Sequence, residues 1–212
     1  MADRLAHFLD PLPFIAVLRG ITPEEIPAVG ATLVAHDFRI VEVPLNSPRP
    51  FESIRRLAQD FGARCLVGAG TVIDIADVAR VKAAGGRVIV MPHGDVAVIR
   101  EAKRQRMFCI PGVATVTEAF AALGAGADAL KMFPAEVLPA SALKAWRAVL
   151  PKDALVFPVG GIRPDTLGPY WAAGANGFGT GSSLYSPGVA ATAVGSAASA
   201  LAAAFRTLPQ RT

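Results

Sequence analysis

The sequence predicts an α/β fold, and within that class a (β/α)₈ TIM barrel built as a single domain over residues 1–212. Three observations favour this fold. Short apolar segments rich in β-branched residues recur roughly every 20 to 26 residues, and helical patterns lie between them. Several of these helices run into small residues and glycine before the next apolar segment. No linker or break in composition divides the chain.

Eight apolar segments are expected to be strands. In chain order they cover residues 14–18, 40–43, 65–68, 88–91, 108–110, 129–132, 155–157 and 177–179. The clearest helical patterns between them cover residues 74–84, 96–106 and 115–123. A short N-terminal helix, from residue 2 to about residue 9, is expected to cover the bottom of the barrel. A C-terminal helix is expected over about 188–207, with Leu201 and Phe205 on its buried face.

The same alternation of strands and helices also fits an open, doubly wound sheet. We favour the barrel because eight strand-helix units fill one, although the chain is near the short end for that fold. In addition, no Gly-x-Gly-x-x-Gly motif follows the first strand, where a dinucleotide-binding sheet would carry it.

Composition excludes several classes of function. The net charge of +4 is modest, and no basic run is interleaved with aromatic residues, so small anions fit better as partners than nucleic acids. Cys65 and Cys109 lack metal or redox spacing and are expected to be buried free thiols. The N-terminus has no secretory signal, and the uncharged stretch 188–205 is too rich in Ala, Gly, Ser and Thr to enter a membrane. We therefore predict a cytoplasmic protein.

Two charged residues, Glu42 and Lys131, lie inside predicted strands. Strands 2 and 6 lie on opposite sides of an eight-stranded barrel, so both side chains can point into one central pocket. They could form a structural ion pair, or they could divide the work of base and nucleophile. Buried ion pairs stabilise poorly, which favours chemistry. A desolvated lysine loses part of its preference for the charged form, and a neutral amine can form a Schiff base with a carbonyl.

Other polar residues gather at the ends of the predicted strands. Gly160-Gly161 and Gly181-Ser182 follow strands 7 and 8, where barrels often bind phosphate, although tight turns alone would also explain these glycines. Arg19 could bind a carboxylate, orient Glu42 or simply lie on the surface. Asn46 could contact a sugar hydroxyl or build a turn. The three histidines lie far apart, so we predict no metal.

Taken together, these motifs resemble the 2-keto-3-deoxy-6-phosphogluconate (KDPG) aldolases, which are class I enzymes. The resemblance covers about residues 12 to 187. The matching segments are 16–20, 42–46, 68–72, 111–112, 130–134, 160–162 and 179–182. Glu42 and Lys131 match the glutamate and lysine of the family. Asn46 stands where the family usually has an arginine, and Val159 stands where the gluconate enzymes have a threonine. Both departures resemble the galactonate branch of the family.

The resemblance implies a lyase without a cofactor. Lys131 would form a Schiff base with a phosphorylated 2-keto-3-deoxy sugar acid, and Glu42 would move protons through water as pyruvate and D-glyceraldehyde 3-phosphate form. Arg19 or Thr71 would bind the carboxylate, Phe133 and Pro92 would line the pocket, and Val159 would meet the hydroxyl that distinguishes the epimers. The phosphate would bind at Gly160, Gly161, Gly181 and Ser182. Members of the family commonly form homotrimers.

Three alternatives remain open from the sequence. The chain could act on the gluconate epimer, the substrate for which the family is named. It could be a barrel isomerase or synthase for a phosphorylated substrate, with the same phosphate loops but no imine. It could also be a sugar-phosphate sensor, which would need no nucleophilic lysine.

Overall fold

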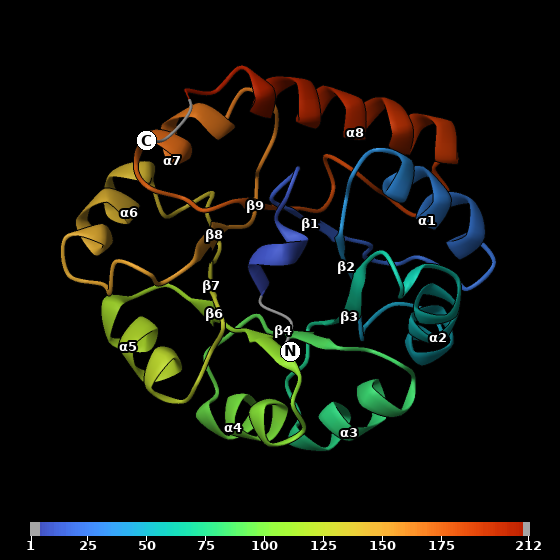
Figure 1. Ribbon diagram of the computed structural model, residues 1–212, viewed down its shortest axis with the longest axis horizontal. Coiled ribbons are helices and arrows are strands. Elements are labelled where there is room, and N and C mark those ends of the chain that lie inside the picture. The colour runs from blue at the N-terminus through green and yellow to red at the C-terminus, as the bar shows by residue number, and fades with distance from the viewer. Residues whose placement is uncertain (1–4, 210–212) are drawn as a thin grey trace.

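A computed structural model describes residues 5–209 and shows a curved parallel sheet with helices packed around its outside (Figure 1). The described strands are β1 (Phe14–Val17), β2 (Ile40–Pro44), β3 (Leu66–Gly70), β4 (Val88–Val90), β5 (Phe108–Ile110), β6 (Gly112–Val113), β7 (Leu130–Met132), β8 (Val156–Pro158) and β9 (Phe178–Thr180). The described α-helices are α1 (Ile26–Ala35), α2 (Pro50–Phe61), α3 (Ile75–Ala83), α4 (Val96–Arg104), α5 (Val116–Gly124), α6 (Ala140–Arg147), α7 (Leu167–Ala172) and α8 (Ala191–Arg206).

Within residues 5–209 the strands pair only in parallel, in the order β5-β4-β3-β2-β1-β9 and the order β6-β7-β8. A single bridge from Val159 to Gly179 connects the end of β8 to β9. The fifth predicted strand corresponds to β5, and β6 is an additional short strand separated from it by Pro111 alone. Proline has no backbone N–H to donate, and at this point the chain changes its partner from β4 to β7.

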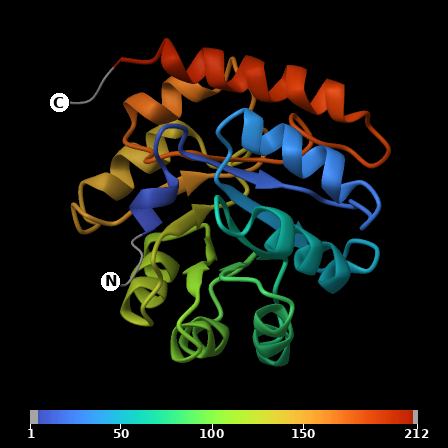
Figure 2. The ribbon, with the colours of Figure 1, turned by 45° about the vertical axis from the view of Figure 1, so that its right-hand side comes forward.

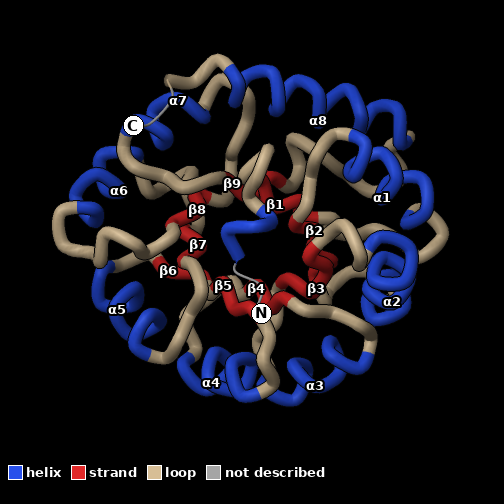
Figure 3. Tube along the Cα trace, in the orientation of Figure 1, coloured by secondary structure: helices blue, strands red, loops and turns tan. Residues whose placement is uncertain are grey.

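The helices lie on the outer face of the sheet, as Figures 2 and 3 show. An open doubly wound sheet would carry helices on both faces, so that alternative is wrong for this chain. Between the sheet and the helices lies one large apolar core, which includes Val41, Val43 and Met132. A second, smaller core fills the inner face of the sheet with Leu5, Ile15, Ile40, Leu66, Val88, Val90, Ile110, Ala129, Phe157 and Val159.

The helices begin where the sequence supplies capping side chains. Asp74 accepts a hydrogen bond from the N–H of Ala76 (2.8 Å) at the start of α3, and Asp95 does the same for Ala97 (2.7 Å) at the start of α4. Thr115 and Glu118 form a capping box at the start of α5. These caps fix where the loops from β3, β4 and β6 end.

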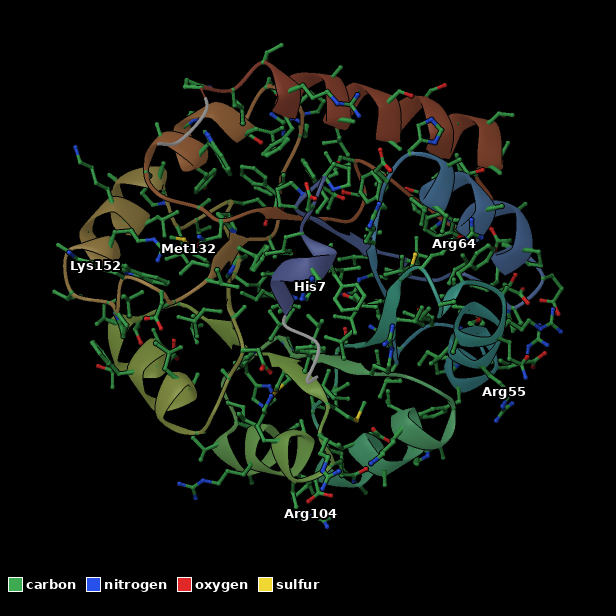
Figure 4. The ribbon with its side chains drawn as sticks, in the orientation of Figure 1. His7, Arg55, Arg64, Arg104, Met132 and Lys152 are labelled. Atoms are coloured by element: carbon green, nitrogen blue, oxygen red, sulfur yellow. The ribbon has the colours of Figure 1, made fainter. Side chains whose placement is uncertain are left out.

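The two ends of the chain were each expected to be helical. The described part of the N-terminal segment forms the 3₁₀ turn η1 (Leu5–Phe8), and Figure 4 shows His7 over the middle of the ring of strands; residues 1–4 lie outside the described region. Near the C-terminus, α8 buries Leu201, and the Phe205 ring meets the Trp171 ring at 5.1 Å between centroids. Of the helices within residues 5–209, none has the length and apolar character needed to cross a membrane.

Candidate active site

The pleat of the strands turns Glu42 and Lys131 toward the inner face of the sheet. In β7, Leu130 and Met132 belong to the outer core, and Figure 4 shows Met132 between the sheet and α6. Because side chains alternate along a strand, Lys131 between them points inward. The same alternation applies to Glu42, which lies between Val41 and Val43 of the outer core. Both charged side chains are buried, with 1% of Glu42 and 6% of Lys131 exposed.

Burial moves both groups toward their neutral forms. Desolvation raises the pKa of Glu42 to about 7, although the positive charges of Lys131 and Arg19 oppose the shift. Desolvation also lowers the pKa of Lys131, and Arg19 adds to this effect while Glu42 opposes it. The Glu42 Oε2 atom is buried without a hydrogen-bond partner among the described residues. A lysine with a lowered pKa beside a carboxyl that titrates near neutrality is suited to nucleophilic attack with proton transfer.

The surroundings of the pair are shaped for these two side chains. The Lys131 Nζ atom lies 4.4 Å from the centre of the Phe133 ring, so an aromatic face borders the amine. At Gly70, the end of β3, a β-carbon would come within 1.9 Å of Glu42 Oε2. Glycine at this position therefore gives the Glu42 carboxyl its room. Phe133 and Gly70 carry no charge, but they shape the space that the Lys131 and Glu42 side chains occupy.

At the same end of the sheet, Arg19 joins the loops that follow β1, β2 and β3. Its guanidinium donates to Asn46 Oδ1 at 2.8 Å and to Thr71 Oγ1 at 3.4 Å. Thr71 has a φ of +56°, a left-handed conformation that is costly for a β-branched residue. The Gly20 N–H donates to Ser47 Oγ at 2.9 Å and ties the first two loops together. An exposed guanidinium beside a hydroxyl is a suitable binding site for a carboxylate.

A cavity of about 150 Å³ opens next to Lys131. Its walls are Val17, Arg19, Lys131, Phe133, Glu136, Val159, Gly160, Gly161, Ile162, Gly181, Ser182 and Ser183. Gly160 and Gly161 have φ values of +106° and +63°, which side chains other than glycine rarely adopt. Within residues 5–209, the backbone N–H groups of Gly161 and Ser182 donate no hydrogen bond. Such N–H groups can bind an anion.

Eight of the residues singled out from the sequence line this cavity, namely Arg19, Lys131, Phe133, Val159, Gly160, Gly161, Gly181 and Ser182. Asn46 and Thr71 are connected to it through their hydrogen bonds to Arg19, and Glu42 through its electrostatic interaction with Lys131. Pro92 does not line it. No group of three or more potential metal ligands occurs in the described part of the chain.

The sequence reasoning missed Val17, Glu136, Ile162 and Ser183 as wall residues. Glu136 carried a signal that could have been used: it is a charged residue in the loop directly after the strand of Lys131. The loop after a strand lies at the same end of the sheet as the other predicted site residues. Val17 and Ile162 are apolar neighbours of predicted residues and carried no comparable signal.

Comparison with known proteins finds a matching family model and several similar proteins. A family model described as KDPG and KHG aldolase matches residues 6–194. The probable 2-dehydro-3-deoxy-6-phosphogalactonate aldolase of Rhizobium meliloti (strain 1021) is 48% identical over 193 residues, which cover 91% of each chain. A solved structure described as native KDPGal is 43% identical with a TM-score of 0.91, and covers 92% of this chain and 95% of its own. A KDPG aldolase from Legionella pneumophila, with pyruvate captured as a covalent carbinolamine, is 28% identical with a TM-score of 0.75, and covers 91% and 93%.

Proposed function

Because the chain belongs to the family of KDPG and KHG aldolases, we propose that it cleaves 2-dehydro-3-deoxy-6-phosphogalactonate to pyruvate and D-glyceraldehyde 3-phosphate. One observation carries the proposal. The buried amine of Lys131 has a lowered pKa and borders a cavity, and a carboxyl whose pKa is raised to about 7 lies close enough to interact with it. These are the two groups that Schiff-base cleavage of a carbon-carbon bond requires.

The reaction begins when the neutral Lys131 amine attacks the C2 ketone of the substrate. The carbinolamine loses water and becomes a protonated imine, which can accept an electron pair. Glu42, directly or through water, accepts the proton of the C4 hydroxyl. The C3–C4 bond then breaks, its electrons flow into the imine to give an enamine, and the aldehyde product leaves. Protonation at C3 and hydrolysis release pyruvate and restore the amine.

The residues that line the cavity would bind the substrate in one orientation. Arg19, held by Asn46 and Thr71, would bind the carboxylate next to C2. Phe133 would pack against the imine, because its ring already borders the Lys131 amine. The phosphate would bind at Gly160, Gly161, Gly181 and Ser182, with the unpaired N–H groups of Gly161 and Ser182 as donors. Pro92 does not line the cavity, so no contact with the substrate is assigned to it.

Choice of the galactonate epimer is assigned to Val159 and Asn46. Val159 is 8% exposed and lines the cavity, so the C4 hydroxyl would meet a methyl group where a threonine would offer a hydrogen bond. Asn46 accepts a hydrogen bond from Arg19, whereas an arginine at position 46 would place a second guanidinium in the site. Similarity supports the galactonate epimer as the substrate, since the relative named as a probable 2-dehydro-3-deoxy-6-phosphogalactonate aldolase is 48% identical and the Legionella KDPG aldolase is 28% identical.

The proposal is tested by comparing turnover of the two epimeric substrates by the purified protein. We expect kcat/KM for the galactonate epimer to exceed that for the gluconate epimer by about tenfold or more. Equal turnover would remove the argument from Val159 and Asn46. Absence of cleavage of both epimers would leave only a sugar-phosphate-binding protein or another reaction.

We also propose that the two sheets form one closed (β/α)₈ barrel in a single domain and that the protein assembles as a homotrimer. The bridge between Val159 and Gly179 and the continuity of the chain through Pro111 support closure. Ile73 and Ile75 support assembly, because they are 61% and 49% exposed beside one another and a partner subunit could cover them. Sedimentation equilibrium measures the assembly directly, and a monomeric mass would contradict it. A cytoplasmic location stays a prediction from the sequence.

A further inference from the structure

Glu136 places a carboxylate against the two glycines that we assign to phosphate binding. A β-carbon on Gly160 would lie 2.9 Å from Glu136 Oε2, and one on Gly161 would lie 2.5 Å from Glu136 Cγ and 3.4 Å from Oε1. The side chain also lines the same cavity as Ser182. An acidic group at this place would repel a phosphate, so the arrangement needs a physical explanation.

The backbone around Glu136 is held firmly. The Ala135 N–H donates to the Val159 carbonyl at 2.9 Å, and the Tyr170 hydroxyl donates to the carbonyls of Ala135 and Leu138 at 2.7 and 2.9 Å. These bonds fix the loop against β8 on one side of Glu136 and against α7 on the other. The position of the Glu136 backbone next to the glycine turn is therefore part of the fold.

The Glu136 carboxylate, by contrast, is held by nothing in the described part of the chain. No hydrogen bond or ion pair joins it to another residue there, although Arg19 and Lys131 line the same cavity. The residue is exposed, so its side chain can rotate toward solvent at little cost. A rigid loop thus carries a side chain that can leave the glycine turn when another anion arrives.

From this geometry, and resting on the proposed function, we propose that Glu136 competes with the substrate phosphate for the turn at Gly160 and Gly161. In the free protein its carboxylate covers the turn. A phosphate must displace it to reach the N–H groups of Gly161 and Ser182, and the returning carboxylate helps the phosphorylated aldehyde to leave. Glu136 is therefore a residue that weakens phosphate binding and so sets the affinity for the phosphorylated end of the substrate.

The test replaces the charge and measures phosphate binding with inorganic phosphate as the probe. In Glu136→Gln and Glu136→Ala, we expect the inhibition constant for inorganic phosphate and the KM for the phosphorylated substrate each to fall about fivefold. The kcat/KM for the same sugar acid without its phosphate should stay within about twofold of the wild-type value. Asp153→Asn makes the same change of net charge at an exposed position between α6 and β8, and should alter none of these constants.

Unchanged constants in both Glu136 variants would overturn the proposal, because the carboxylate would then have no effect on phosphate binding. Raised constants would also overturn it, because they would show that Glu136 supports the site or the substrate. Calorimetric titration with inorganic phosphate measures the same affinity without turnover. If the wild-type protein forms no pyruvate adduct and cleaves neither epimer, the proposed function fails. The calorimetric comparison of wild type with Glu136→Gln would still decide whether Glu136 competes for the anion.

Discussion

The inner face of the curved sheet has two layers, an apolar lower layer where the strands begin and an upper layer with ionisable groups where they end. Where the strands begin, Ile15, Ile40, Leu66 and Val88 are at most 2% exposed and fill the interior with hydrocarbon. Where the strands end, the same interior holds a buried amine and a buried carboxyl that has an unpaired oxygen. Apolar burial stabilises the fold, whereas each buried ionisable group costs free energy. The lower layer therefore stabilises the fold, and part of that stability offsets the cost of burying the reactive groups in the upper layer.

Removing the Lys131 amine from the upper layer should change activity more than any other substitution considered. Lys131→Ala should lower cleavage about 10³-fold or more, because within residues 5–209 no other lysine lines the cavity and could form the imine. Its thermal midpoint should equal or exceed that of the wild type, since a desolvated amine is removed. Lys152→Ala removes an exposed lysine and should leave both quantities unchanged. Loss of folding in Lys131→Ala would show that the lysine is structural.

The lower layer should behave in the opposite way. Phe157 pairs with Lys131 along the sheet, but its ring lies toward the beginning of the strands, where a β-carbon on Gly177 would meet it at 2.6 Å. It is fully buried, so Phe157→Ala should lower the free energy of unfolding by about 3–5 kcal/mol, as measured by chemical denaturation. The matched change at an exposed apolar position, Val149→Ala, should cost less than about 0.5 kcal/mol. Catalysis by the folded fraction of Phe157→Ala should fall far less than in Lys131→Ala. A small loss of stability would mean that the lower layer is loosely packed.

Glu42 in the upper layer should make the stability of the protein depend on pH. Its pKa is about 7 in the folded protein and 4.5 ordinarily, so between these values the folded state holds a proton that the unfolded state has lost. Stability from this group therefore falls as pH rises from 4.5 to 7 and is level above that window. Glu42→Gln removes the effect, and its advantage over wild type in free energy of unfolding should grow across the window to about 3 kcal/mol. Denaturation curves measured across the window check this, and an advantage independent of pH would contradict it.

A more modest change, in the selectivity between the two epimeric substrates, is expected from Val159 in the upper layer. Val159→Thr adds a hydroxyl where we place the C4 hydroxyl of the substrate, and should shift the ratio of kcat/KM for the two epimers about tenfold toward gluconate. Val17→Thr adds the same group elsewhere in the cavity and serves as the control. Parallel assays with both substrates measure the ratio. An equal shift in the two variants would mean that Val159 has no special role.

Much of this arrangement follows from local sequence patterns. The predicted segments at 40–43 and 108–110 overlap β2 and β5, and the predicted helix at 115–123 overlaps α5, because periodicity and capping act over a few residues. The inward direction of Glu42 and Lys131 follows from the alternation of side chains along a strand. The change of partner at Pro111 could not be predicted, since pairing depends on distant strands.

Contacts between loops were the least predictable part of the site. The bonds from Arg19 to Asn46 and Thr71 join positions 27 and 52 residues apart in sequence, and no local pattern specifies them. The meeting of Glu136 with Gly160 and Gly161 likewise depends on how two loops from neighbouring strands pack. The sequence identified the kinds of groups at this end of the sheet, and their mutual contacts required the folded structure.

Borohydride trapping tests whether Lys131 is the amine that forms the imine. The protein is incubated with pyruvate, sodium borohydride is added, and tryptic peptides are analysed by mass spectrometry, with the Lys131→Ala variant treated in parallel. We predict one reduced pyruvate adduct, located on Lys131 and missing from the variant. An unmodified Lys131 peptide in the wild-type protein, or an adduct on another lysine, would show that Lys131 is not the imine-forming amine.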